Sequence, residues 1–80
     1  MEKSIHTPRY RALIDWLKKN RKEQGYSLRD LEEKVGFTNS TISKIERYEK
    51  RLDIEEFLRF CDVLGIDPSE GISLVNKYPR

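Results

Sequence analysis

Apolar side chains recur along the chain with the spacing of amphipathic helices. The first group follows the pattern i, i+3, i+4, i+7 and consists of Tyr10, Leu13, Ile14 and Leu17. This spacing puts the four side chains on one face of a helix. Thr7 is a suitable N-cap with Pro8 behind it in the first turn, and Gly25 is a suitable end. The pattern predicts a first helix over residues 9–24.

The stretch that follows predicts a short second helix and a tight turn. Ser27 and Asp30 have the spacing of a capping box, in which two free backbone N–H groups at a helix start are satisfied. This helix is expected over residues 28–34. Gly36 can adopt the left-handed conformation that closes a helix and turns the chain. Helices this short are unstable alone in water and need neighbours that bury their apolar sides.

A third helix is predicted over residues 39–47, with Thr38 as its N-cap. The apolar residues of the second and third helices and their turn are expected to face inward: Leu28, Leu31, Val35, Phe37, Ile42 and Ile45. Small polar and basic side chains remain on the outer face of the third helix: Asn39, Ser40, Ser43 and Lys44. Side chains of these types suit the edges of DNA bases.

A basic loop and a fourth helix come next. Residues 46–52 have no apolar period and carry Arg47, Lys50 and Arg51, which predicts a loop with potential phosphate contacts. Asp53 and Glu56 then form another capping box at the start of a helix over residues 54–64, which ends at Gly65. Its core-facing residues are expected to be Ile54, Phe57, Leu58, Cys61 and Leu64.

The last apolar group predicts a fifth helix that begins at Asp67 and Pro68. Its apolar residues are Ile72, Leu74 and Val75. The chain is therefore expected to be all-α, with five helices in one domain over residues 9–75. Residues 1–8 and 76–80 are expected to be tails.

Composition supports a compact, water-exposed domain. The chain has 80 residues, of which 36 % are apolar and 38 % are charged, values too apolar for a disordered protein and too polar for a membrane protein. The longest apolar run covers residues 12–14, whereas a membrane span needs about 18 residues. We therefore expect a cytoplasmic protein without a membrane partner.

The reactive side chains are too few for a metal site or a catalytic centre. Cys61 is the single cysteine and His6 the single histidine, so neither a disulfide nor a zinc cluster can form within the chain. No glycine-rich phosphate loop or paired-carboxylate site is evident. The sequence predicts no enzyme activity, no metal and no cofactor.

Charge is unevenly distributed along the chain. Residues 1–51 hold 13 Lys or Arg and 8 Asp or Glu, a net charge of +5, whereas residues 52–80 hold 3 and 6, a net charge of −3. Such a dipole would turn the basic half toward a polyanion. Two ordinary solvated faces account for the distribution equally well, so charge alone does not decide between these interpretations.

The residues from Gly25 to Glu46 form a recognisable signature. It comprises Gly25, Ser27, Leu31, Val35 and Gly36, followed by Ser40, Thr41, Ile42, Ser43, Lys44, Ile45 and Glu46. With these residues the chain resembles the Cro and phage-repressor type of helix-turn-helix, the XRE family of bacterial and phage regulators. The similarity covers about residues 10–75. It implies a five-helix, lambda-repressor-like DNA-binding domain with the helix-turn-helix at the second and third helices.

The resemblance also implies which residues contact DNA. In this family the third helix lies in the major groove, which implies base contacts from Asn39, Ser40, Ser43 and Lys44. Asn39 can pair with adenine and Lys44 can donate to guanine. Backbone contacts are implied for Arg21, Thr38, Arg47, Lys50 and Arg51. The family also pairs an arginine with a glutamate at the positions of Arg21 and Glu46, which would fix the third helix against the first. The plainer alternative for the outward polar residues is simple solvation.

Three residues depart from the family pattern. Leu28 replaces a glutamine that often binds phosphate, and Glu32 stands where alanine allows close helix packing. Glu32 would then separate the two helices slightly or bend out to solvent. Tyr48 replaces the usual glycine after the third helix. We expect a different exit there, such as an extra helical turn, with Tyr48 stacked on a sugar or on a partner chain.

These observations predict a sequence-specific transcriptional regulator, a repressor that binds operator half-sites in double-stranded DNA as a homodimer. Its dimer surface is expected to lie in the acidic C-terminal part, where five residues exceed what one small core can bury: Phe60, Ile66, Ile72, Leu74 and Tyr78. A better-filled monomer core is the alternative. Other functions compatible with the sequence are a restriction-modification controller, an antitoxin that also binds a small toxin protein, and a protein-interaction module that does not bind DNA.

Overall fold

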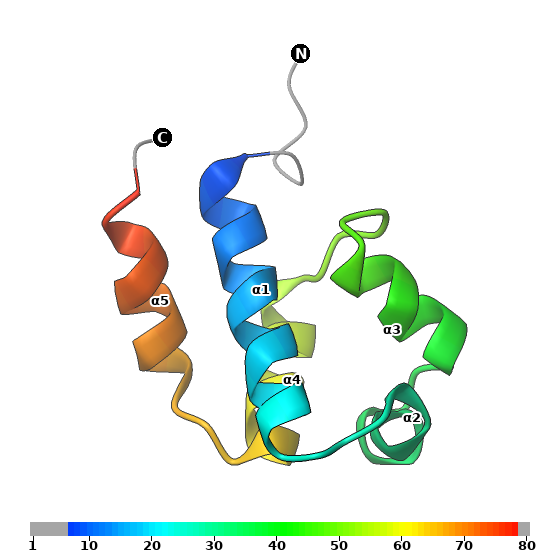
Figure 1. Ribbon diagram of the computed structural model, residues 1–80. Coiled ribbons are helices and arrows are strands. Elements are labelled where there is room, and N and C mark those ends of the chain that lie inside the picture. Colours follow the sequence, from blue (N-terminus) through cyan, green and yellow to red (C-terminus); the bar gives the residue numbers. More distant parts are fainter. Residues whose placement is uncertain (1–6, 79–80) are drawn as a thin grey trace.

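The computed structural model describes residues 7–78, which form five helices and no strand, arranged as in Figure 1. They are α1 (Pro8–Glu23), α2 (Leu28–Val35), α3 (Asn39–Glu46), α4 (Ile54–Leu64) and α5 (Pro68–Asn76). The predicted all-α, five-helix fold is confirmed. Each predicted helix boundary lies within about one residue of the observed boundary. The predictions for His6 and for most of the two tails lie outside the described residues.

Local sequence signals account for the helix boundaries. The capping boxes at Ser27 with Asp30 and at Asp53 with Glu56 both form, with each side chain bonding the other residue's backbone N–H. Gly36 and Gly65 close α2 and α4 in the left-handed conformation, at φ of 83° and 65°. That conformation is strained for residues with a Cβ, so glycine fits both turns.

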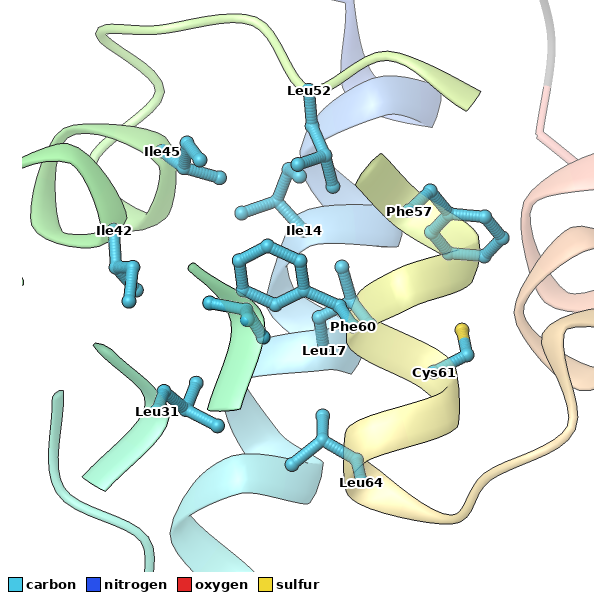
Figure 2. Packing of buried hydrophobic residues seen from close by; sticks show 11 residues of the cluster. Ile14, Leu17, Leu31, Ile42, Ile45, Leu52, Phe57, Phe60, Cys61 and Leu64 are labelled. Carbon is cyan, nitrogen blue, oxygen red and sulfur yellow. The ribbon is translucent and has the colours of Figure 1, made fainter. Parts of the chain in front are cut away.

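One hydrophobic core is shared by the four helices α1, α2, α3 and α4. Figure 2 shows side chains from these helices and from the loop before α4 converging between the ribbons. The buried cluster consists of Ile14, Leu17, Leu31, Val35, Ile42, Ile45, Leu52, Phe57, Phe60, Cys61 and Leu64. Helix α5 packs mainly along α1 and also contacts α4. The shared core is what holds the short helices α2 and α3 in place.

The predicted burial of residues in α4 was wrong in part. Ile54 is 69 % exposed and Leu58 44 % exposed, although both were expected to face the core. Phe60, expected at a dimer surface, is buried at 4 % exposure. The buried stripe of α4 runs through Phe57, Phe60, Cys61 and Leu64, which is again the i, i+3, i+4, i+7 spacing of one helix face. Ile54 and Leu58 lie beside that stripe rather than on it.

Two residues of the helix-turn-helix are less buried than expected. Leu28 and Phe37 are half-buried and pack against the edge of the core. The ring of Phe37 lies against that of Phe60, with the ring centroids 5.9 Å apart. Within residues 7–78, no helix is both long and apolar enough to span a lipid bilayer.

Candidate nucleic-acid interface

The two faces of α3 differ completely in character. Ile42 and Ile45 are 0 % and 2 % exposed and hold the helix on the core. Of the four predicted base-contacting residues, Asn39, Ser40 and Lys44 are exposed and Ser43 is half-buried. The structure therefore places an amide, two hydroxyls and an ammonium on the outer side of one rigid helix.

The start of α3 carries a fixed cap and free amides. The Thr38 hydroxyl accepts the backbone N–H of Thr41 at 3.2 Å and donates to the Thr41 hydroxyl at 3.0 Å. The backbone N–H groups of Asn39 and Ser40 have no acceptor among residues 7–78. Free amides at a helix N-terminus favour an anion such as phosphate.

Arg59 fastens the turn between α2 and α3 to α4. Its guanidinium donates to the carbonyl oxygen of Val35 at 3.2 Å and to the Glu55 carboxylate at 2.7 Å. The same guanidinium lies 5.8 Å from the centre of the Phe37 ring. This contact was not predicted from the sequence, because only the packing of α4 against the turn brings Arg59 close to Val35.

The predicted pair of Arg21 and Glu46 is confirmed. Two N–H groups of Arg21 donate to the two Glu46 carboxylate oxygens at 2.7 and 2.9 Å, and a third donates to the carbonyl oxygen of Tyr26 at 2.7 Å. The two side chains are only 10 % and 12 % exposed. This bidentate pair joins α1 to the C-terminal end of α3 and so fixes the orientation of α3.

The basic loop at residues 47–51 presents its cations to solvent. Arg47, Lys50 and Arg51 are all exposed. Arg47 lies 3.6 Å from the Glu49 carboxylate in an ion pair that is more than half exposed, and exposed pairs of this kind hold a side chain only weakly. The loop therefore offers three charged groups for a polyanion.

Tyr48 does not produce the extra helical turn that was expected. Helix α3 ends at Glu46, and Tyr48 adopts the left-handed conformation itself, at φ of 64°. It thus takes the backbone conformation for which the family usually has glycine. Its hydroxyl donates to the Asp15 carboxylate, and this hydrogen bond raises the pKa of Tyr48. The ring packs against the Arg11 guanidinium at 4.9 Å.

The remaining reactive group lies in the core. Cys61 is fully buried, and burial raises the pKa of its thiol to about 11. A thiol in that state is inert at neutral pH. No cluster of three metal-binding side chains occurs within residues 7–78.

Comparisons with known proteins agree with this geometry. A helix-turn-helix family model matches residues 17–71. Among solved structures, an XRE-family like protein from Pseudomonas syringae pv. tomato str. DC3000 superimposes with a TM-score of 0.83. The two sequences are 38 % identical, and the match covers 95 % of this chain and 94 % of that one. No match was found among curated proteins.

Proposed function

This chain belongs to the XRE family of DNA-binding helix-turn-helix regulators, and from that premise we propose that it is a transcriptional repressor that binds operator half-sites as a homodimer. The observation that supports this best is the polar outer face of α3, held in a fixed orientation by Arg21, Glu46 and Arg59. A helix fixed in this way can enter the major groove without reordering.

We assign the base contacts to Asn39, Ser40, Ser43 and Lys44 of α3. The Asn39 amide can both donate and accept, which suits adenine, while Lys44 suits the two acceptors of guanine. Ser40 and Ser43 can pair with several bases. These four residues occupy a single helix of eight residues, so they can contact only a few consecutive base pairs.

The backbone contacts come from the residues that flank α3. Arg47, Lys50 and Arg51 supply charge after the helix, and Thr38 with the adjacent free amides supplies donors before it. These contacts add affinity without adding sequence preference. Arg21 is the weakest of the candidates, because its side chain is 10 % exposed and three of its N–H groups already have partners.

The exposed apolar side chains of α4, of α5 and of Tyr78 just after α5 supply the surface for a second copy. Ile54, Leu58, Ile72, Leu74 and Tyr78 are each between 39 % and 69 % exposed. Helix α5 contacts α1 and α4 but not α3, and it lies on the far side of α1 from α3 in Figure 1. A dimer formed there leaves both recognition helices free, and the two helices must then lie about 34 Å apart to reach successive major grooves.

Selection of bound sequences from a random duplex pool tests this function. We expect a palindromic consensus with half-sites separated by about one helical turn. Asn39→Ala should relax the preference at one position, whereas Lys50→Ala should weaken binding to all sequences alike. Weak binding without any consensus would favour a protein-interaction module instead.

The oligomeric state is tested separately by sedimentation. A monomer at high micromolar concentration, in the presence and absence of DNA, would contradict the homodimer. Copurification of a small second protein that is lost in Ile54→Glu would instead assign the apolar face to a toxin, as in an antitoxin.

A further inference from the structure

The basic loop is attached to α1 at both of its ends. Near its start, the Tyr48 hydroxyl donates to Asp15. At its end, the backbone N–H of Leu52 donates to the Tyr10 hydroxyl at 2.8 Å. The loop therefore lies against the N-terminal half of α1, and side chains on that part of α1 belong to the same surface as the loop.

Arg11 is the basic residue of α1 at this junction. It is exposed, and its guanidinium lies 4.9 Å from the centre of the Tyr48 ring. Asp15, the partner of the Tyr48 hydroxyl, is four residues further along α1 and therefore on the same helix face. Tyr48 thus both donates a hydrogen bond to a carboxylate of α1 and packs against a cation of the same helix face.

The position of Arg11 over the Tyr48 ring makes it chemically different from Arg21. Three N–H groups of Arg21 are used by Glu46 and Tyr26. The Arg11 guanidinium makes no hydrogen bond or ion pair with any residue between 7 and 78, and it lies over an aromatic ring instead. Stacking orders a planar guanidinium through its face and leaves the N–H donors at its edge for an acceptor such as phosphate.

We propose that Arg11 is an additional contact to the DNA backbone and that Tyr48 is the positioning residue that directs it. This inference rests on the proposed function, since it requires α3 to lie in the groove. It extends the backbone-contacting surface from the loop at residues 47–51 onto α1. It also gives a role to Tyr48. A glycine at this left-handed position would provide no ring.

Salt-dependent titration of a labelled mixed-sequence duplex tests the role of Arg11. Each phosphate contact contributes about 0.9 to the slope of log affinity against log salt, so Arg11→Gln should lower the slope by about that amount. Arg9→Gln is the matched control, because it removes the same charge from an exposed position two residues away, about 200° around the helix. Its slope should equal that of the unmodified protein. Equal slopes for Arg11→Gln and Arg9→Gln would overturn the inference.

Variants of Tyr48 test the positioning role. Tyr48→Phe keeps the ring and should retain the full slope, whereas Tyr48→Gly keeps the backbone conformation without the ring and should reduce it as Arg11→Gln does. The double variant Tyr48→Gly with Arg11→Gln should show no further reduction. Additive losses, or a full slope in Tyr48→Gly, would contradict the positioning role, and circular dichroism confirms that each variant is folded.

The proposed function and this inference fail in different ways. An unmodified protein that binds no duplex at low salt would remove both. An unmodified protein that binds a selected duplex with clear preference, while Arg11→Gln changes no slope, would leave the regulator intact and remove only the contact of Arg11.

Discussion

The helix-turn-helix unit, α2 and α3, and the C-terminal face, α4 and α5, differ in whether they expose large apolar side chains. On α3 the exposed residues carry amide, hydroxyl and ammonium groups, as in Asn39, Ser40 and Lys44. On the C-terminal face large apolar side chains are exposed among polar ones, with Ile54 the extreme at 69 % exposure. Apart from α5, both regions share a single core. The difference therefore concerns what each outer surface suits: a polar, charged ligand on one side and an apolar partner on the other.

The two regions are also attached to α1 by different interactions. The C-terminal end of α3 is attached through the pair of Arg21 and Glu46, with N···O distances of 2.7 and 2.9 Å. Helix α5 is attached by close packing of Gly71, where an added Cβ would lie 2.6 Å from a Trp16 ring carbon. Loss of a charge should therefore affect the first attachment, and added volume should affect the second.

The largest effect is expected for Glu46→Gln. This change leaves the Arg21 guanidinium largely buried without its anionic partner, which should lower the free energy of unfolding by about 3–5 kcal/mol. Urea denaturation measures the change. Glu49→Gln is the matched control, because its pair with Arg47 is more than half exposed and should contribute only about 0–1 kcal/mol. Equal losses in the two variants would show that the pair does not hold α3 in place.

A pair of isoleucines tests whether a buried side chain of α3 contributes more to the free energy of unfolding than an exposed side chain of α5. Ile42→Ala removes a side chain that is 0 % exposed, which should cost about 2–5 kcal/mol. Ile72→Ala, at 46 % exposure, should change monomer stability by only about 0.5 kcal/mol. Thermal unfolding at low protein concentration measures both. A large loss of monomer stability in Ile72→Ala would mean that the C-terminal face is part of the core and not a free surface.

The sequence predicted the helices because their signals are local. Ser27 with Asp30 and Asp53 with Glu56 are three residues apart, and a capping box depends only on that spacing. The pair of Arg21 and Glu46 is 25 residues apart, and its prediction came from the family resemblance instead. Local spacing thus defines the elements, while their contacts require either a relative or the structure.

Several parts of the site were missed because they depend on how the helices dock. Arg59 bonds a carbonyl oxygen 24 residues away, and Tyr48 bonds Asp15 at a separation of 33 residues. Neither partner can be identified from spacing along the chain. The same limit explains Ile54 and Leu58, since periodicity gives the apolar side of a helix but not the width of the surface that its neighbours cover.

A smaller effect is expected where α5 meets α1. In Gly71→Ala the new methyl group would meet the Trp16 ring at 2.6 and 2.7 Å, and overpacking of this kind costs about 1–3 kcal/mol. We expect a lower melting temperature and a shift of tryptophan fluorescence, since Trp16 is the single tryptophan. Ser73→Ala, on the exposed side of α5, is the control and should leave both unchanged. An unaltered fluorescence spectrum in Gly71→Ala would show that the side of α5 facing α1 is not closely packed.

The smallest effect concerns pH and the start of α2. Hydrogen bonds from the Ser27 backbone N–H and hydroxyl hold the pKa of Asp30 below its ordinary value. Because the folded-state pKa is lowered, Asp30 stabilises the fold above the unfolded-chain pKa of about 3.9, and this contribution is lost as pH falls through the folded-state pKa. Carboxyl NMR titration should show the lowered pKa of Asp30, and Ser27→Ala should raise that pKa only in part, because the backbone N–H of residue 27 still donates to the carboxylate. The Thr38 cap of α3 has no carboxylate. Acid should therefore loosen the first turn of α2 before that of α3, and amide exchange that increases equally at both starts would contradict this order.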